Sequence, residues 1–286
     1  MKTSRYILLM LGIVGLWSCS GGVMPVSEPQ IVVEGWIENG AAPIVIVTST
    51  VPVTEEIKDV NELRQYIVTW AKVTVSDGTE SIVLTGRRDD NQFPPYVYTT
   101  SRMKGETGKS YTVTVECSER KATATTTIPK PVALEYVKAT RSSEDDGKIL
   151  LTAGLKDNAQ EKNYYKSFVK IKGKDTYYHP SFMGLIDDEV LEEEVEEIPI
   201  NNGPNSLTGK RNPYFEPTDT VTVRFCTMDK ASFDYWTDFD TISSLSRNPF
   251  FPSTDKMRSN VSGGLGYWAG YGTTYHTVTI PDCLEE

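Results

Sequence analysis

The chain has 286 residues, of which 38% are hydrophobic and 10% aromatic, and its formal net charge is -10. This charge argues against a nucleic-acid partner, which selects basic surfaces, and against electrostatic adhesion to anionic lipid. The hydrophobic content is sufficient for a real core, and the length predicts one large or two ordinary domains.

The first nineteen residues have the layout of a bacterial lipoprotein signal peptide. Lys2 and Arg5 precede an apolar run over residues 7–17, a small residue follows, and then comes Cys19, which can be acylated after cleavage. A transmembrane helix needs roughly 20 apolar residues, so the run is too short for a permanent anchor helix. An ordinary secretory signal with a cysteine nearby is the other alternative.

We therefore predict a signal peptide over residues 1–18, a lipid anchor on Cys19 and a flexible tether over residues 19–29. Cleavage would leave 268 residues (286 minus 18), and the loss of Lys2 and Arg5 would change the formal charge from -10 to -12.

The remaining cysteines, Cys117, Cys226 and Cys283, are far apart, and none has a histidine nearby. Zinc sites need clustered ligands at short spacing, so we expect no metal site. One disulfide with one free thiol, and three buried thiols, are both compatible with this spacing.

Residues 30–130 have the pattern of consecutive short strands, which predicts an immunoglobulin- or fibronectin-like β-sandwich domain. Asp77-Gly78 predicts a hairpin turn because both residues tolerate positive φ. Tyr111 precedes a clean alternation and is similar in position to the tyrosine corner of immunoglobulin-like sandwiches. Residues 62–70 are also compatible with one helical turn. The predicted strands cover residues 31–37, 43–50, 72–75, 82–84, 96–100, 111–115 and 122–128.

Residues 131–286 are predicted to form a second β-rich domain that carries one amphipathic helix. Pro129 and Pro131 mark the boundary, because proline removes a donor from a strand ladder. Asp229 is a good N-cap, and apolar residues recur at every third position after it, which predicts a helix over residues 230–246. The predicted strands cover residues 134–140, 148–155, 164–172, 220–227 and 273–280.

An acidic stretch over residues 187–197 holds eight acids in eleven positions. Calcium prefers several carboxylate and carbonyl oxygens, but the stretch lacks the alternating Asp, Asn and Gly of a calcium loop. Blocks of like charge usually stay solvated, which favours an exposed loop or a frayed helix. Calcium and a basic partner are the alternatives.

A glycine-rich stretch over residues 262–272 carries five glycines together with Tyr267, Trp268 and Tyr271. A phosphate-binding loop would lead into a helix, whereas this stretch leads into a predicted strand. We expect the glycines to permit tight turns and close backbone packing. The three aromatic residues are candidates to line a sugar or peptide groove, or else to pack against Phe233 and Trp236 of the predicted helix.

Catalytic constellations are scarce in this sequence. The only histidines are His179 and His276, and no serine lies in a nucleophile-elbow pattern. A carboxylate pair for glycoside hydrolysis cannot be chosen among 39 acidic residues. We therefore expect a protein that is not an enzyme and has no cofactor.

Several short motifs, taken in order, resemble one family. They are Val32-Val33-Glu34-Gly35-Trp36-Ile37, Ala122-Thr123-Ala124 leading to Ile128-Pro129, Asp219-Thr220-Val221, Phe233-Asp234-Tyr235-Trp236, Asn248-Pro249-Phe250, Ser259-Asn260-Val261-Ser262-Gly263-Gly264-Leu265-Gly266 and Gly270-Tyr271-Gly272. Together they resemble the domain-of-unknown-function family 4249, lipoproteins of the Bacteroidota, over residues 27–280.

The resemblance implies an outer-membrane lipoprotein, often encoded beside a TonB-dependent transporter, and supplies no catalytic residue. We expect the protein to be lipid-anchored, with the cell surface favoured over the periplasmic face, although no acidic export signal follows Cys19. The leading hypothesis is an accessory or ligand-capturing partner of such a transporter in nutrient uptake. The alternatives are a structural or adhesive surface module and an enzyme acting on peptide or glycan.

Overall fold

A computed structural model describes residues 28–51, 60–142, 147–158, 160–191, 194–203, 212–245 and 257–282. The predicted signal peptide, Cys19 and the tether up to residue 27 lie outside the described residues, as does Cys283.

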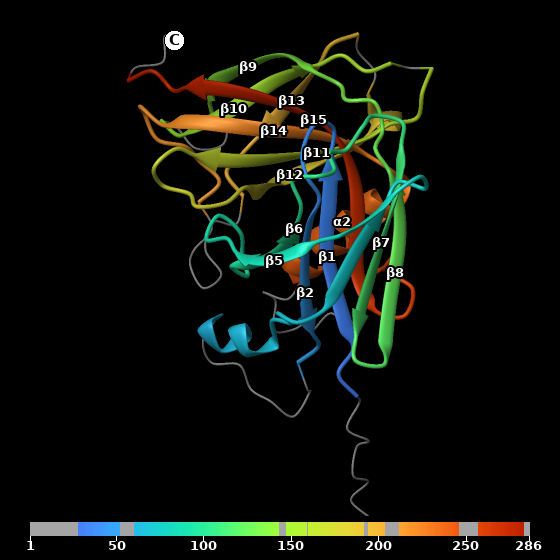
Figure 1. The fold of residues 1–286 in the computed structure, drawn as a ribbon. Coiled ribbons are helices and arrows are strands. Elements are labelled where there is room, and N and C mark those ends of the chain that lie inside the picture. Colours follow the sequence, from blue (N-terminus) through green and yellow to red (C-terminus); the bar gives the residue numbers. More distant parts are fainter. Residues whose placement is uncertain are drawn as a thin grey trace, which may run out of the picture.

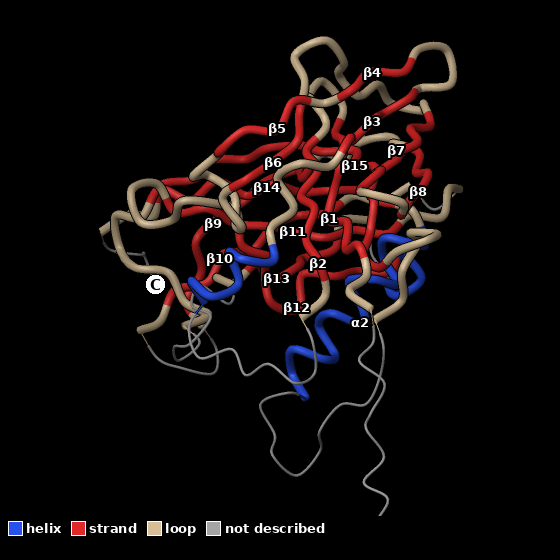
Figure 2. The backbone as a smooth tube through the Cα atoms, turned by 60° about the horizontal axis from the view of Figure 1, so that its bottom comes forward, coloured by secondary structure: helices blue, strands red, loops and turns tan. Residues whose placement is uncertain are grey.

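The chain is mainly β, as predicted, with helix confined in the described residues to short segments and one α-helix (Figures 1 and 2). The largest sheet contains β1 (Ile31–Glu38), β2 (Ile44–Ser49), β5 (Thr85–Arg88), β6 (Tyr96–Thr99), β11 (Tyr164–Ile171), β12 (His179–Asp187), β14 (Thr220–Met228) and β15 (Leu265–Thr279). A second sheet contains β3 (Lys72–Ser76), β4 (Ser81–Val83), β7 (Ser110–Cys117) and β8 (Arg120–Thr127). A third contains β9 (Leu134–Arg141), β10 (Ile149–Leu155) and β13 (Glu196–Ile200). The helical elements are η1 (Val60–Tyr66), η2 (Asp188–Val190) and α2 (Lys230–Leu245).

The first core lies between the four-stranded sheet, in the order β4-β3-β7-β8, and the β1-β2-β6 part of the largest sheet. Strand β7 illustrates how the strands bury one face in this core. Its Tyr111, Val113 and Val115 are buried, whereas Thr112 and Thr114 alternate with them on the outer face, because successive side chains of a strand point to opposite sides. This arrangement of two sheets around one core is a sandwich, as the sequence predicts.

Two local predictions in the sandwich are confirmed. The Tyr111 hydroxyl accepts a hydrogen bond of 2.9 Å from the Glu106 N–H and donates one of 3.4 Å to the Lys104 carbonyl, which is the backbone contact of a tyrosine corner. Gly78 adopts a φ of 89° in the turn between β3 and β4, a value that glycine adopts without steric cost.

The second core lies between the β11-β14 part of the largest sheet and the three-stranded sheet, in the order β13-β10-β9. Helix α2 packs on the other face of the largest sheet and begins where the sequence predicts. The Asp229 carboxylate caps it by accepting a hydrogen bond of 2.8 Å from the Ser232 N–H. None of the helices in the described part of the chain is long and apolar enough to cross a membrane.

Strand β15 joins the two halves of the chain. It pairs parallel with β1 over its first half and antiparallel with β14 over its second half, so one sheet passes from the first core to the second. The two cores divide near residues 128–134, except that Val261 and Trp268 belong to the first. The predicted division into domains 30–130 and 131–286 stays a prediction.

The glycine-rich stretch packs closely against neighbouring backbones, as predicted, but most of it belongs to β15, which begins at Leu265 and not at residue 273. A Cβ on Gly266 would lie 1.9 Å from the Val33 carbonyl oxygen, and one on Gly270 would lie 2.6 Å from the Thr127 carbonyl oxygen. The glycines therefore allow neighbouring backbones to approach the strand closely. Close packing, rather than a series of turns, explains these two positions.

Candidate binding face

The face of the largest sheet that carries α2 concentrates ionisable and aromatic side chains. Because alternate residues of a strand share one face, β1 presents Glu34, Trp36 and Glu38 on this side, opposite its core residues Val33 and Ile37. The neighbouring strands add the other members, described below. Helix α2 covers only part of this face.

An ion pair is buried at one end of this face. Arg224 Nη2 on β14 lies 2.5 Å from Glu38 Oε1 on β1, and the two residues are 6% and 5% exposed. The Tyr275 hydroxyl on β15 donates a hydrogen bond of 2.7 Å to Glu38 Oε2. Burial opposes the charge on Arg224, but the Glu38 carboxylate keeps the pKa of the guanidinium raised.

Aromatic rings surround this guanidinium. Its Cζ lies 4.8 Å from the ring centre of Phe168, 5.3 Å from that of Tyr271, 5.7 Å from that of Trp36 and 5.9 Å from that of Tyr178. Such distances allow cation–π attraction, which strengthens when the cation is desolvated. Arg224 is therefore held in place by four aromatic rings and one carboxylate.

We call Trp36, Tyr178 and Tyr275, which lie above the Glu38–Arg224 pair, the collar. Trp36 and Tyr178 are half-buried, and Tyr275 is 54% exposed although its hydroxyl is bound to Glu38. Within the described residues, Arg224 Nε and Nη2 have no hydrogen-bond acceptor of suitable geometry. Nη2 still faces Glu38 in the ion pair, and both nitrogens are buried, so the collar covers a guanidinium whose hydrogen bonding is incomplete.

Glu34 lies nearer to α2 and is held differently. The Tyr267 hydroxyl donates a weak hydrogen bond of 3.4 Å to it, and the Tyr235 ring of α2 stacks on Tyr267 with 4.2 Å between ring centres. Burial raises the pKa of the Glu34 carboxyl to about 7, and the bond from Tyr267 offsets this only in part. This acid therefore titrates near neutral pH.

Lys166 on β11 is fully buried under α2. Its ammonium lies 2.9 Å from Asp240 Oδ2 and 5.3 Å from the Trp236 ring centre. Burial lowers the pKa of Lys166, and Asp240 opposes that change. The pair ties the middle of α2 to the sheet.

Cys226, on the same face of β14, has its pKa raised to about 11 by burial. A thiol needs to ionise in order to act as a nucleophile, and this one stays protonated at neutral pH. The face thus presents aromatic rings, hydroxyls and a paired guanidinium together with this protonated thiol.

The aromatic residues that the sequence singled out lie inside the protein. Tyr267 and Tyr271 are 5% and 1% exposed and pack under α2, where the Trp236 indole N–H donates a hydrogen bond of 3.0 Å to the Tyr271 hydroxyl. Trp268 faces the opposite way into the first core and donates a hydrogen bond of 2.8 Å to the Tyr111 carbonyl. Their burial does not fit an open sugar or peptide groove. It fits the alternative, packing against the helix, for Tyr267 and Tyr271.

The collar residues were missed by the sequence analysis. Glu34, Trp36 and Glu38 at alternating positions, and Arg224 as the one charged residue of its strand, were the available signals. A charged side chain that is buried in a strand needs an oppositely charged or hydrogen-bonding partner. The sequence alone does not show which residue that partner is.

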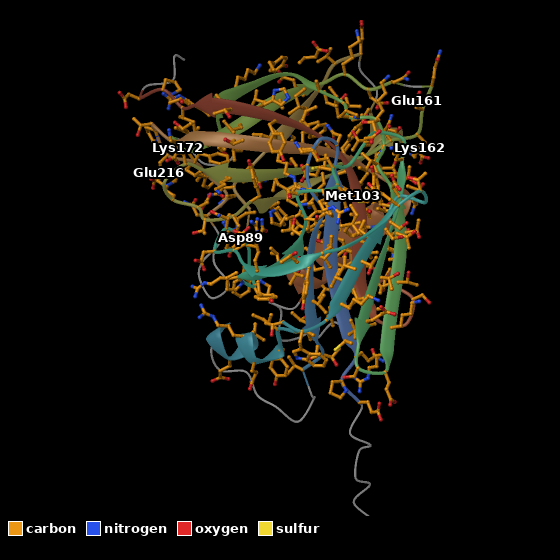
Figure 3. All side chains as sticks on the ribbon, in the orientation of Figure 1. Asp89, Met103, Glu161, Lys162, Lys172 and Glu216 are labelled. Atoms are coloured by element: carbon orange, nitrogen blue, oxygen red, sulfur yellow. The ribbon has the colours of Figure 1, made fainter. Side chains whose placement is uncertain are left out.

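Three lysines pair with five of the eight acids of the acidic stretch. Lys162, labelled in Figure 3, forms ion pairs with Asp187, Asp188 and Glu189, and Glu194 and Glu197 pair with Lys156 and Lys138. The stretch forms η2 and the start of β13 instead of one continuous loop or helix. Among the residues that the structure describes, no group of His, Cys, Asp or Glu could hold a metal ion.

The histidines and thiols take structural positions. His179 lies 3.6 Å from Asp175, and His276 Nε2 accepts a hydrogen bond of 3.3 Å from the Leu134 N–H. Cys117 and Cys226 are free thiols.

Comparison with protein-family models gives one match over residues 23–277, to the domain of unknown function DUF4249. The chain belongs to this family. The match runs from before β1 to within two residues of the end of β15, so the DUF4249 domain comprises both cores, α2 and the collar. No curated protein matched the chain.

Proposed function

We propose that this DUF4249 protein is a non-enzymatic outer-membrane lipoprotein that acts as an accessory, ligand-capturing partner of a TonB-dependent transporter. The sequence pattern that ends at Cys19 supports the lipid anchor. The acidic body supports partners other than nucleic acid. We propose that the lipid-anchored protein lies on the outer surface of the cell, where it would encounter the nutrient.

The collar is the observation that carries this proposal. Tyrosine, tryptophan and arginine are the residues that most often dominate binding energy at protein interfaces. Here two partly exposed tyrosines and a half-buried tryptophan surround a buried arginine. The group is preorganised, because Glu38 holds both Arg224 and the Tyr275 hydroxyl. Preorganised side chains lose little conformational freedom when a partner binds.

The position of the collar also suits a membrane partner. Strand β1 begins just after the tether and ends at Glu38, and eight residues of strand span about 25 Å. Glu38, which lies beneath the collar, is therefore about 25 Å along the strand from the residue at which β1 begins. A transporter that rises from the membrane beside the anchor could reach the collar.

The pairing of the buried groups supports a binding role over catalysis. Arg224 is paired with Glu38, Lys166 with Asp240, and the Cys226 thiol stays protonated. A catalytic acid or base needs to be within reach of a substrate as well as perturbed in pKa. Glu34, the acid with a pKa near 7, lies beneath Tyr235 and Tyr267.

Affinity purification of the lipidated protein from its own outer membrane tests the proposal. We expect the wild type and the control variant Tyr214→Ala to copurify a β-barrel transporter, and the double variant Tyr178→Ala/Tyr275→Ala to copurify at least tenfold less. Thermal melting of all three establishes that they fold. If the purified wild-type protein brings no transporter with it, the proposal is refuted. If a deletion mutant loses adhesion but shows no nutrient-specific growth defect, the structural module is favoured.

A further inference from the structure

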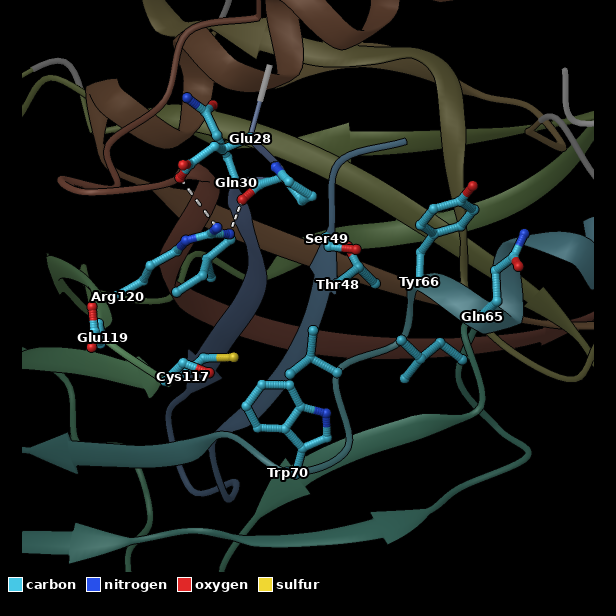
Figure 4. A pocket seen from close by; sticks show the side chains of 15 residues that line it. Glu28, Gln30, Thr48, Ser49, Gln65, Tyr66, Trp70, Cys117, Glu119 and Arg120 are labelled. Atoms are coloured by element: carbon cyan, nitrogen blue, oxygen red, sulfur yellow. Dashed lines mark hydrogen bonds and ion pairs between the residues drawn. The ribbon is translucent and has the colours of Figure 1, made fainter. Parts of the chain in front are cut away.

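The end of the molecule from which the tether departs carries a pocket of about 760 Å³ (Figure 4). Glu28 and Arg120 border one side of it, Tyr66 and Gln65 lie opposite, and Trp70 borders a third side. Arg120 binds the Pro29 carbonyl and lies 3.4 Å from Glu28 Oε2. We call the surface formed by Glu28, η1, Trp70 and the β7–β8 turn the base face; in Figure 1 it lies at the lower end.

Trp70 is the most exposed tryptophan among the described residues. It is 65% exposed, whereas Trp236 and Trp268 are 7% and 0% exposed and Trp36 is half-buried. Leaving such a large side chain in water costs free energy that burial would recover. Indole is favoured at membrane interfaces, where its apolar body and its polar N–H are both satisfied.

The backbone around Trp70 is firmly held. The Tyr98 hydroxyl donates a hydrogen bond of 2.8 Å to the Val68 carbonyl and accepts one of 3.0 Å from the Ala71 N–H. The Tyr96 hydroxyl donates one of 3.1 Å to the Thr69 carbonyl. The Trp70 backbone is therefore part of a loop fixed on both sides, and its indole is 65% exposed.

The length of the tether limits how far the base face can be from the anchor. Eight residues lie between Cys19 and Glu28, and the nine residue-to-residue steps of a fully extended chain span about 30 Å. Glu28 itself lies on the rim of the pocket. If Cys19 carries the lipid, the base face is the surface that meets the membrane.

The described residues of the base face carry little net charge. They include three acids, Glu28, Glu62 and Glu119, and two bases, Arg64 and Arg120, whereas the whole chain has a net charge of -10. An anionic lipid surface repels negative charge within a Debye length. The described residues of the base face thus meet little of that repulsion, although the protein as a whole is acidic.

We propose that the base face rests on the lipid headgroups of the membrane that holds the anchor, with Trp70 in the interface and the pocket open toward the headgroups. This inference rests on the anchoring part of the proposed function. In this arrangement the base face contacts lipid, and the collar points away from the membrane, toward the protein partner or the nutrient.

Tryptophan fluorescence in vesicles tests the proposal. The mature lipidated protein is reconstituted into vesicles of phosphatidylethanolamine and phosphatidylglycerol that carry brominated acyl chains near the headgroups. Bromine quenches only nearby indoles. We expect the wild type to be quenched, the variant Trp70→Phe to lose at least two thirds of that quenching, and the matched control Trp36→Phe to retain it.

A second experiment tests the proposed membrane face independently of lipidation at Cys19. A mature chain with a histidine tag at position 19 is bound to the same vesicles through a nickel-chelating lipid, and a control chain carries the tag after Glu286. We expect Trp70-dependent quenching only for the tag at position 19. If mass spectrometry finds Cys19 unacylated, the lipoprotein proposal alone is refuted. If neither the lipidated protein nor the protein tagged at position 19 shows Trp70-dependent quenching, the proposed membrane face alone is refuted.

Discussion

Replacing Glu34 by glutamine removes the buried acid between β1 and α2 and should change how the stability of the protein depends on pH. Burial raises the pKa of Glu34 from 4.5 to about 7. The side chain faces Tyr267 on β15, and the Tyr235 ring on α2 covers that tyrosine. Glutamine has nearly the same shape and carries no charge, so it resembles the protonated acid.

The sign follows from the raised pKa. Below about pH 4.5 the carboxyl is protonated in both the folded and unfolded states and has no effect. As pH rises from 4.5 to 7, the unfolded chain loses this proton first, and the folded state is destabilised progressively. A change from 4.5 to about 7 corresponds to about 3 kcal/mol, an upper bound because Glu34 retains some contact with solvent.

Urea denaturation of the wild type and of Glu34→Gln at several pH values measures the effect. We expect equal free energies of unfolding near pH 4.5 and an advantage of about 2 to 3 kcal/mol for the variant at pH 8.5. The exposed acid Glu80 supplies the control, since Glu80→Gln should change stability by less than about 0.5 kcal/mol at either pH. A difference between wild type and Glu34→Gln that does not grow with pH would refute the reasoning.

Three further predictions concern packing. Asp240→Asn leaves the buried Lys166 ammonium without its carboxylate and should lower the free energy of unfolding by about 3 kcal/mol; urea denaturation should show most of this loss restored by the second substitution Lys166→Met. Gly266→Ala should lower the free energy of unfolding by more than about 3 kcal/mol, because the new Cβ would lie 1.9 Å from a backbone oxygen. Gly78→Ala places its Cβ in open space and should lower it by about 1 kcal/mol, through the positive φ alone. Equal melting temperatures for these two glycine variants would contradict this. Tyr111→Phe removes both hydrogen bonds of the tyrosine corner and should cost about 1 to 2 kcal/mol in the same urea assay, with unchanged secondary structure by circular dichroism.

The sequence by itself determined the local elements. The alternation around Tyr111 predicts β7 and its buried face, Asp77-Gly78 predicts the hairpin turn, and Asp229 predicts the start of α2, because each depends on neighbouring residues only. The ordered motifs also indicated the family that the comparison found over residues 23–277.

The tertiary structure alone decided which strands pair and which ionisable groups meet. Nothing local predicts that β1 pairs in parallel with β15, more than 220 residues later in the chain, and that pairing turns the glycine-rich stretch into a strand. The collar draws on Trp36, Tyr178 and Tyr275, and its ion pair joins Glu38 to Arg224. Burial and charge pairing depend on neighbours in space, so a pKa near 7 for Glu34, or an exposed position for Trp70 beside the tether, appears only once the sheets are assembled.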